Sequence, residues 1–167
     1  ANGIDLELWC SQTAPFPRLA QSLQAYLAAA GIRIKIVQRD AGAMRDAARA
    51  GQTDLVVKDW YADYPDAENF LFPLLHTANR GAGGNVSFFS NPAFDKLVDD
   101  SHREADAVKR AELYRQADAL AYEQMAVVPL FFYNELYAIQ PWVQGFAVPV
   151  IFNGQRWTTV RLGTTSP

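Results

Sequence analysis

The sequence has a single cysteine, Cys10, among its 167 residues, so it cannot form an internal disulfide. This cysteine ends a strand-like run, and we expect it to behave as a small buried hydrophobic side chain. A lone cysteine is compatible with both the cytosol and the periplasm. Cysteine content therefore does not identify the compartment.

Long apolar runs and an excess of basic residues are also missing. No apolar stretch approaches the ~20 residues that a membrane-spanning helix needs. Lys and Arg number 15 against 18 Asp and Glu, which gives a net charge of −3 and a pI near 5.3. Because a nucleic-acid-binding domain needs a basic face, we expect no nucleic-acid partner.

Histidine is scarce as well. The two histidines, His76 and His102, are far apart, and no cluster of His, Cys and carboxylate residues has the spacing of a metal site. We therefore expect no metal ion and no cofactor. The first residues, Ala1 to Asp5, have neither the positive charge nor the apolar core of a signal peptide. This start predicts either a cytoplasmic protein or a processed or truncated chain.

The first third of the sequence alternates between strand and helix patterns. The predicted strands cover 4–10, 32–37 and 54–58, and the predicted helices between them cover 16–30 and 43–50. Strands and helices in this order, joined by short connections, favour right-handed crossovers. The sequence therefore predicts an α/β fold with a mostly parallel sheet flanked by helices.

The remainder of the chain has three more helix patterns and two strand patterns. The predicted helices cover 69–75, 92–101 and a longer stretch capped by Asp106, and the predicted strands cover 127–133 and 136–139. We interpret the glycine-rich segment from Asn79 to Asn85 as a flexible connector, because it lacks the spacing of a phosphate-binding loop. After Gln140 the sequence has turn residues and aromatics but no helix pattern.

The most informative segment runs from Trp60 to Phe70, with the sequence W-Y-A-D-Y-P-D-A-E-N-F, directly after the third predicted strand. Pro65 disfavours helix at the residue before it, so we expect a loop. In open parallel sheets, ligands bind beyond the carboxyl ends of the strands. Aromatic rings beside a carboxylate suit a ligand that is partly apolar and positively charged, such as an amine. The alternative is an aromatic surface turn that packs on its own domain.

Six segments carry a resemblance that covers nearly the whole chain. They are Gly31–Ile34, Asp54–Phe70, Asn91–Leu97, Lys109–Tyr114, Val128–Phe132 and Pro141–Phe146. In this order they resemble the C-terminal part of the family 5 extracellular solute-binding proteins, which serve ABC importers of peptides and related solutes. No single segment is decisive, and the resemblance depends on their common order.

Members of this family are much longer, and their two lobes close on the ligand. The resemblance implies that residues 1–140 are most of one periplasmic-binding-protein-like lobe, and that the extended segment 141–167 returns to an N-terminal lobe that this sequence lacks. It also implies a small peptide or related solute as ligand and an ABC transporter permease as partner. The implied location is the periplasm or the extracellular face of the membrane, and no catalysis is expected.

The resemblance also implies a ligand-binding set. In peptide-binding members an aspartate of the W-x-x-D loop pairs with the α-ammonium group of the ligand. Asp63 occupies that position, and Trp60 is the matching aromatic residue. We expect Tyr61, Tyr64 and Asn69 to complete the set. The loop departs from the family at Ala67, where many members have proline.

Two other functions remain open. Some bacterial transcription regulators resemble a DNA-binding domain fused to this same module, so a cytoplasmic solute sensor is the main alternative. The other is glycoside hydrolysis by Asp63 and Asp66. That reaction requires two carboxyl groups held ~5 to 9.5 Å apart across a bond, which a three-residue spacing in a proline-containing loop does not guarantee.

Overall fold

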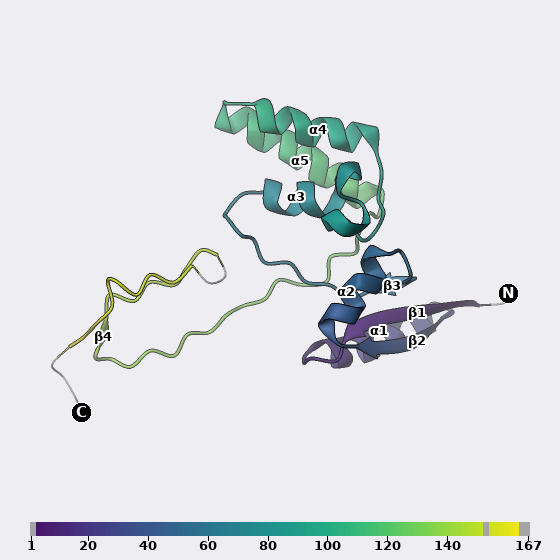
Figure 1. Ribbon diagram of the computed structural model, residues 1–167, viewed down its shortest axis with the longest axis horizontal. Coiled ribbons are helices and arrows are strands. Elements are labelled where there is room, and N and C mark those ends of the chain that lie inside the picture. Colours follow the sequence, from purple (N-terminus) through teal and green to yellow (C-terminus); the bar gives the residue numbers. More distant parts are fainter. Residues whose placement is uncertain (1–2, 152–153, 164–167) are drawn as a thin grey trace.

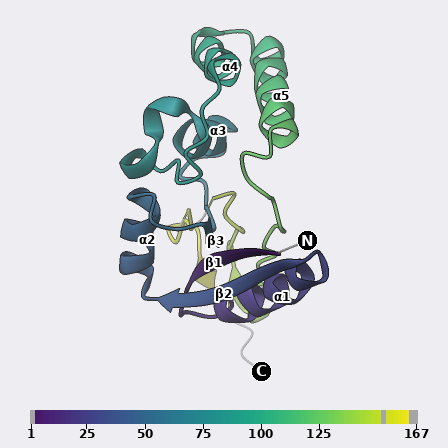
Figure 2. The same cartoon turned by 90° about the vertical axis from the view of Figure 1, so that its right-hand side faces the viewer.

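The computed structural model describes residues 3–151 and 154–163. We divide it into a sheet body (residues 3–58), the Trp60 loop (residues 59–67), a helical body (residues 68–126) and a C-terminal arm (residues 127–163). Figures 1 and 2 show the helices of the helical body gathered beyond the sheet body, and Figure 1 shows the arm running away from both. None of the helices in the described residues has the length and apolarity that crossing a membrane requires.

The sheet body contains three parallel strands. They are β1 (Ile4–Ser11), β2 (Ile32–Arg39) and β3 (Leu55–Val56), arranged in the order β2-β1-β3. This arrangement confirms the predicted parallel sheet. The third strand is shorter than predicted, although the amide of Val57 still donates to the carbonyl of Trp9 at 2.9 Å.

Two helices flank this sheet, and both were predicted. The first, α1 (Phe16–Ala29), has a proline in its first turn and is followed by Gly31 at φ +83°, a usual residue at this position. The second, α2 (Ala41–Arg49), begins where the carboxylate of Asp40 accepts two backbone N–H bonds. The buried cluster of this body consists of Leu8, Cys10, Ala20, Ile34 and Val57. Burial raises the pKa of the Cys10 thiol, as expected for an interior side chain.

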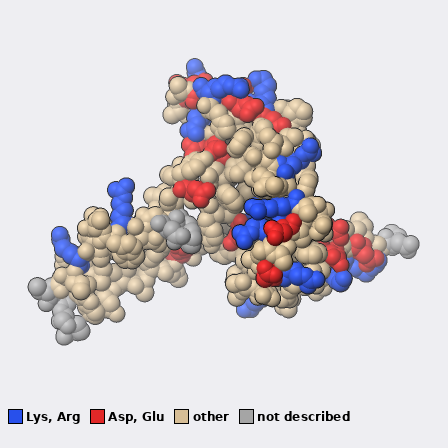
Figure 3. Space-filling view, in the orientation of Figure 1, with Lys and Arg blue, Asp and Glu red and all other residues tan. Residues whose placement is uncertain are grey.

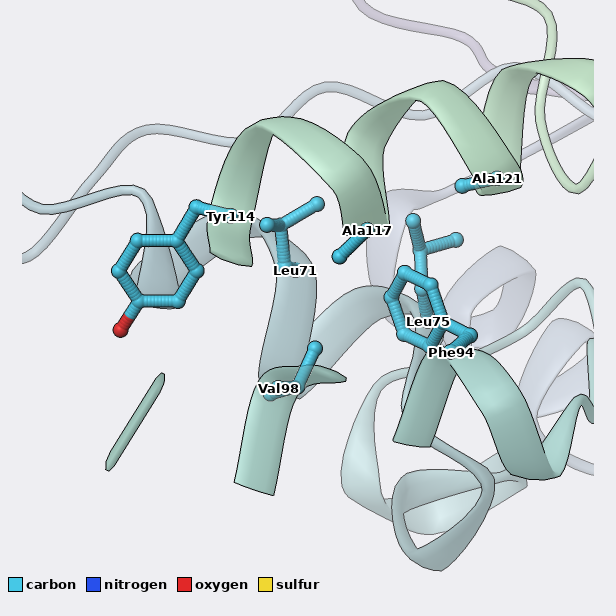
Figure 4. Packing of buried hydrophobic residues seen from close by; sticks show 7 residues of the cluster. All are labelled: Leu71, Leu75, Phe94, Val98, Tyr114, Ala117 and Ala121. Atoms are coloured by element: carbon cyan, nitrogen blue, oxygen red, sulfur yellow. The ribbon is translucent and has the colours of Figure 1, made fainter. Parts of the chain in front are cut away.

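The helical body has a core of its own. Its helices are α3 (Glu68–Leu75), α4 (Pro92–Arg103) and α5 (Ala107–Glu123), close to the predicted ranges. Asn91 and Asp106 cap α4 and α5 through side-chain oxygens that accept backbone N–H bonds. Figure 4 shows how the buried side chains of the three helices meet: Leu71, Leu75, Phe94, Val98, Tyr114, Ala117 and Ala121.

The glycine-rich segment is ordered, so its interpretation as a flexible connector was wrong. It forms two 3₁₀ turns, 77–79 and 81–83, and then Asn85, whose side chain is fully buried. The Nδ2 group of Asn85 donates to the carbonyls of Leu75, His76 and Phe89 at 3.0 to 3.2 Å. A buried amide that satisfies three carbonyls fixes the backbone around it, and the apolar pattern of the sequence does not report such a contact.

The predicted strands at 127–133 and 136–139 are also corrected by the structure. Residues 128–140 have an irregular backbone and belong to no sheet among the described residues. Their β-branched and aromatic composition favours strands, but a strand exists only where a neighbour accepts and donates its hydrogen bonds. Further along, β4 (Val143–Gln144) and β5 (Arg161–Leu162) form a short antiparallel pair, and no helix forms in the described part of the arm, as predicted.

Candidate functional site

The Trp60 loop leaves the sheet at the carboxyl end of β3 and enters α3 at Glu68. Asn69, in the first turn of that helix, is only 5% exposed. Its side-chain oxygen accepts the indole N–H of Trp60 at 3.2 Å and the backbone N–H of Asp63 at 2.9 Å. One buried amide thus holds an aromatic ring and the backbone of an acidic residue in fixed relative positions.

The carboxylate of Asp63 is left for solvent. The residue is exposed, and no Lys, Arg or His within residues 3–151 and 154–163 forms an ion pair with it. A fixed backbone with an unpaired carboxylate can accept a hydrogen bond from an external cation without first breaking an internal contact.

Asp66, three residues later, is in the opposite situation. One of its oxygens accepts from Arg110 of α5 at 2.7 Å, and the other accepts the backbone N–H of Glu68 at 2.9 Å. Partial burial raises the pKa of Asp66, but the Glu68 amide and the Arg110 guanidinium outweigh it, and the pKa lies below its ordinary value. Asp66 therefore joins the loop to α5 and is not available as the second carboxylate of a hydrolase.

The two predicted tyrosines contact different parts of the molecule. Tyr64 is 45% exposed, and its hydroxyl donates to the carboxylate of Glu68, a contact that raises the Tyr64 pKa. Tyr61 stacks instead on Tyr133 of the C-terminal arm, with ring centroids 6.0 Å apart and planes inclined by 12°. The structure thus brings Trp60, Asp63 and Asn69 together, with Tyr61 on the arm side and Tyr64 on the α3 side.

Tyr133 contacts the candidate site, and sequence reasoning missed it. Its ring also meets Phe131 edge to face, at 5.1 Å between centroids. Burial raises the pKa of its phenol, and the nearby charge of Asp59 adds to this effect. The only sequence signal was the aromatic run from Phe131 to Tyr133, which looks like any strand and does not reveal a contact with a loop seventy residues away.

A groove of about 510 Å³ lies between the end of the Trp60 loop, α3 and α5, and Asp66 is part of its lining. Phe70, Arg110 and Tyr114 line it, and none of the five predicted site residues does. Within the part of the chain that the structure describes, no group of three or more His, Cys, Asp or Glu residues could hold a metal ion. The chemistry of the Trp60 loop is therefore that of an acid beside aromatic rings.

Comparison with known proteins gives close relatives. Di/tripeptide-binding protein 4 of Pseudomonas aeruginosa is 34% identical over 150 residues, which are 89% of this chain and 28% of that protein. A dipeptide-binding protein of the same species is 32% identical over 153 residues, with the same two shares. The chain thus spans less than a third of the length of these relatives.

Solved structures agree with this relationship. The DppA protein of Helicobacter pylori, determined with the peptide STSA, has a TM-score of 0.73 and 30% identity over 77% of this chain and 25% of its own. HbpA2 of Haemophilus parasuis reaches a TM-score of 0.79 at 27% identity over 96% of this chain and 32% of its own. The fold is therefore that of a periplasmic-binding-protein lobe. Residues 4–82 match the middle part of the bacterial extracellular solute-binding proteins of family 5, and the chain belongs to this family.

Proposed function

We propose that this chain is one lobe of a solute-binding protein that captures short peptides in a cleft between lobes and delivers them to an ABC importer. The single observation that carries the proposal is Asp63, an exposed carboxylate that no cation among the described residues pairs with and whose backbone is held by Asn69. The relatives named above bind dipeptides and tripeptides, which supports short peptides as the ligand. The protein would then act in the periplasm or at the outer face of the membrane, without catalysis.

The chemistry of the loop fits the amino terminus of a peptide. An ammonium group at Asp63 forms a charge-assisted hydrogen bond, which sets the orientation of the ligand. The rings of Trp60 and Tyr61 provide apolar surface beside it, and their faces attract a cation. The same carboxylate would repel a ligand whose first group is an anion, so the loop selects for a free amino end.

We further propose that residues 1–140 form the lobe and that residues 141–167 return to a second lobe. What supports this division is a set of large apolar side chains after residue 140 that the described chain leaves open: Val148 is 61% exposed, Val150 is 85% exposed and Trp157 is 66% exposed. Large apolar residues left open in this way mark a surface that another part of a protein covers.

The test is Asp63→Asn in the full-length protein, with dipeptide affinity measured by calorimetry. Loss of the charged acceptor should weaken binding by at least about 1.5 kcal/mol, roughly tenfold, the scale of a hydrogen bond to a charged group. Asp118→Asn is the matched control, because Asp118 is an exposed acid on α5 outside the Trp60 loop and should leave the affinity unchanged.

A second arm of this experiment uses an N-acetylated dipeptide, which has no ammonium group. Wild type and Asp63→Asn should bind it equally and weakly. Equal affinity of the two proteins for the free dipeptide would remove Asp63 from the site and overturn the proposal.

The alternative of a cytoplasmic regulator differs in what precedes the lobe. A secretion signal upstream of Ala1 in the reading frame supports transport, and a winged-helix domain there supports regulation. Nothing in the geometry favours glycoside hydrolysis, because Arg110 and the Glu68 amide occupy both oxygens of Asp66.

A further inference from the structure

The glycine-rich segment and Lys58 have no part in the site as described, yet both connect to its central aromatic ring. We propose that Lys58 is a positioning residue for Trp60, and that the carbonyl of Gly84 holds the lysine in place. The inference rests on the proposed function, since it assigns Lys58 the task of orienting an indole that faces the peptide.

The contacts define the position of the indole on two sides. The ammonium of Lys58 lies 5.2 Å from the centroid of the Trp60 ring, within the range of a cation–π interaction. At the edge of the ring, Nε1 donates to Asn69. A ring held on one face by a cation and at one edge by an amide keeps its other face for a ligand. The lysine thus acts through Trp60 and does not touch the peptide itself.

The ammonium is directed by a second contact. It donates to the carbonyl of Gly84 at 3.1 Å, directly before Asn85 in the glycine-rich segment. Gly84 has φ +122°, and a Cβ at this residue would lie 2.9 Å from the carbonyl oxygen of Pro73. Only glycine fits without a shift of the backbone. With Asn85 buried next to it, the Gly84 carbonyl is a fixed acceptor.

The charges around Lys58 disfavour its protonated form, so the ammonium depends on its contacts with the Gly84 carbonyl and the Trp60 ring. Partial burial lowers the pKa of Lys58, Arg49 and Arg45 of α2 lower it further, and only Asp59 opposes them. No carboxylate within the described residues forms an ion pair with Lys58. The Gly84 carbonyl and the indole face are therefore the contacts that hold the cation above Trp60.

The first measurement follows the indole N–H signal of Trp60 by nuclear magnetic resonance in the full-length protein, between pH 8 and 11. This signal is assigned by its loss in Trp60→Phe. In the wild type it should move as Lys58 loses its proton, with a midpoint below the ordinary lysine pKa of 10.5. In Lys58→Met, which keeps the apolar stem, the part of the shift that comes from Lys58 should vanish, and only the effect of nearby phenols such as Tyr64 should remain. A merely structural role of the lysine stem would give the same pH dependence in the wild type and in Lys58→Met.

The second measurement is dipeptide affinity at pH 7. Lys58→Met should bind about two- to fivefold more weakly, the scale of an exposed cation–π contact, and Lys58→Arg should restore most of the affinity. Lys35→Met is the control, because Lys35 is an exposed residue of β2 paired with Glu7. A Trp60 signal with the same pH dependence in the wild type and in Lys58→Met, or Lys58→Met with wild-type affinity, would overturn the inference.

The outcomes separate this inference from the proposed function. If Asp63→Asn weakens binding and Lys58→Met does not, the peptide site stands and Lys58 has no part in it. If the Trp60 signal titrates with Lys58 but Asp63→Asn binds as the wild type does, the lysine–indole contact is present and the proposed function fails, and the positioning role fails with it.

Discussion

The helical body and the C-terminal arm are both rich in large apolar side chains, but the helical body buries them and the arm leaves many of them exposed. Phe94, in the core of α3, α4 and α5, is completely buried, whereas Phe132 in the arm is 94% exposed. The helical body folds its apolar stripes against one another (Figure 4). In the described part of the arm the strands β4 and β5 pair with each other, and Tyr133 stacks on Tyr61 of the Trp60 loop.

The arm also carries little charge. Between residues 127 and 163 the only charged side chains are Glu135, Arg156 and Arg161, and Figure 3 shows the arm as almost entirely tan. A surface of this kind is unusual for a segment that stays in water. A segment rich in apolar residues therefore forms a buried core only where the rest of the chain supplies side chains to pack against it. For the arm, we propose that the second lobe supplies them.

The largest expected effect concerns the buried core of the helical body. Phe94→Ala empties a fully buried site and loses the edge-to-face contact with Phe89 at 5.4 Å. It should lower the free energy of unfolding by about 3 to 5 kcal/mol, measured by urea denaturation followed by circular dichroism. The matched variant is Phe132→Ala, which removes the same atoms from the arm. Equal losses in the two variants would show that the arm is packed in solution.

The next effect concerns a polar contact in the helical body. Asn85→Ala leaves the carbonyls of Leu75, His76 and Phe89 without their shared donor in a buried place. We expect a loss of about 2 to 3 kcal/mol in the free energy of unfolding, since each buried unsatisfied group is costly. Asn134→Ala, at an exposed residue of the arm, is the control. A variant as stable as the wild type would mean that the glycine-rich segment is mobile after all.

A smaller effect depends on pH. Asp66 has a lowered pKa in the folded protein, so its ion pair stabilises the fold above the ordinary value of 3.8 and this contribution is lost as the pH falls through the lowered pKa. Its side chain is 25% exposed and that of Arg110 is 36% exposed, so screening limits the effect. Asp66→Asn should cost about 1 to 2 kcal/mol at pH 7.

The same variant should match the wild type once the pH lies below the lowered pKa. Chemical denaturation at a series of pH values measures both curves. A constant difference at all pH values would show that the lost stability comes from packing and not from the charge of Asp66.

Sequence reasoning succeeded where the cause is local. The alternation of β1 and β2, the caps at Asn91 and Asp106 and the loop at Pro65 all depend on neighbouring residues. The order of strand and helix patterns predicted the parallel sheet, and the family resemblance identified it as a periplasmic-binding-protein lobe. The pairing of Asp66 with Arg110 spans 44 residues, and the stacking of Tyr61 on Tyr133 spans 72. No local pattern specifies such contacts.

The same limit explains the errors. The segment 127–139 has strand composition but pairs with no strand among the described residues, and composition alone cannot report that. Asn85 has a buried amide that donates to carbonyls four to ten residues away, and the apolar pattern of the sequence carries no signal of these bonds. For the site, the sequence placed Asp63 and Trp60 in one loop, whereas the role of Asn69 in joining them needed coordinates.

The smallest expected effect concerns the exposed apolar side chains of the C-terminal arm. Leu136 is 96% exposed, so Leu136→Ser in this chain alone should change the free energy of unfolding by no more than about 0.5 kcal/mol. It should also reduce self-association at high concentration, measured by sedimentation, because it removes part of an uncovered apolar surface. In the full-length protein the same change should cost about 1.5 to 3 kcal/mol, the value of a buried leucine. Equal, negligible losses in both proteins would mean that residue 136 faces water in each, and the proposed cover of the arm by a second lobe would then fail at this point.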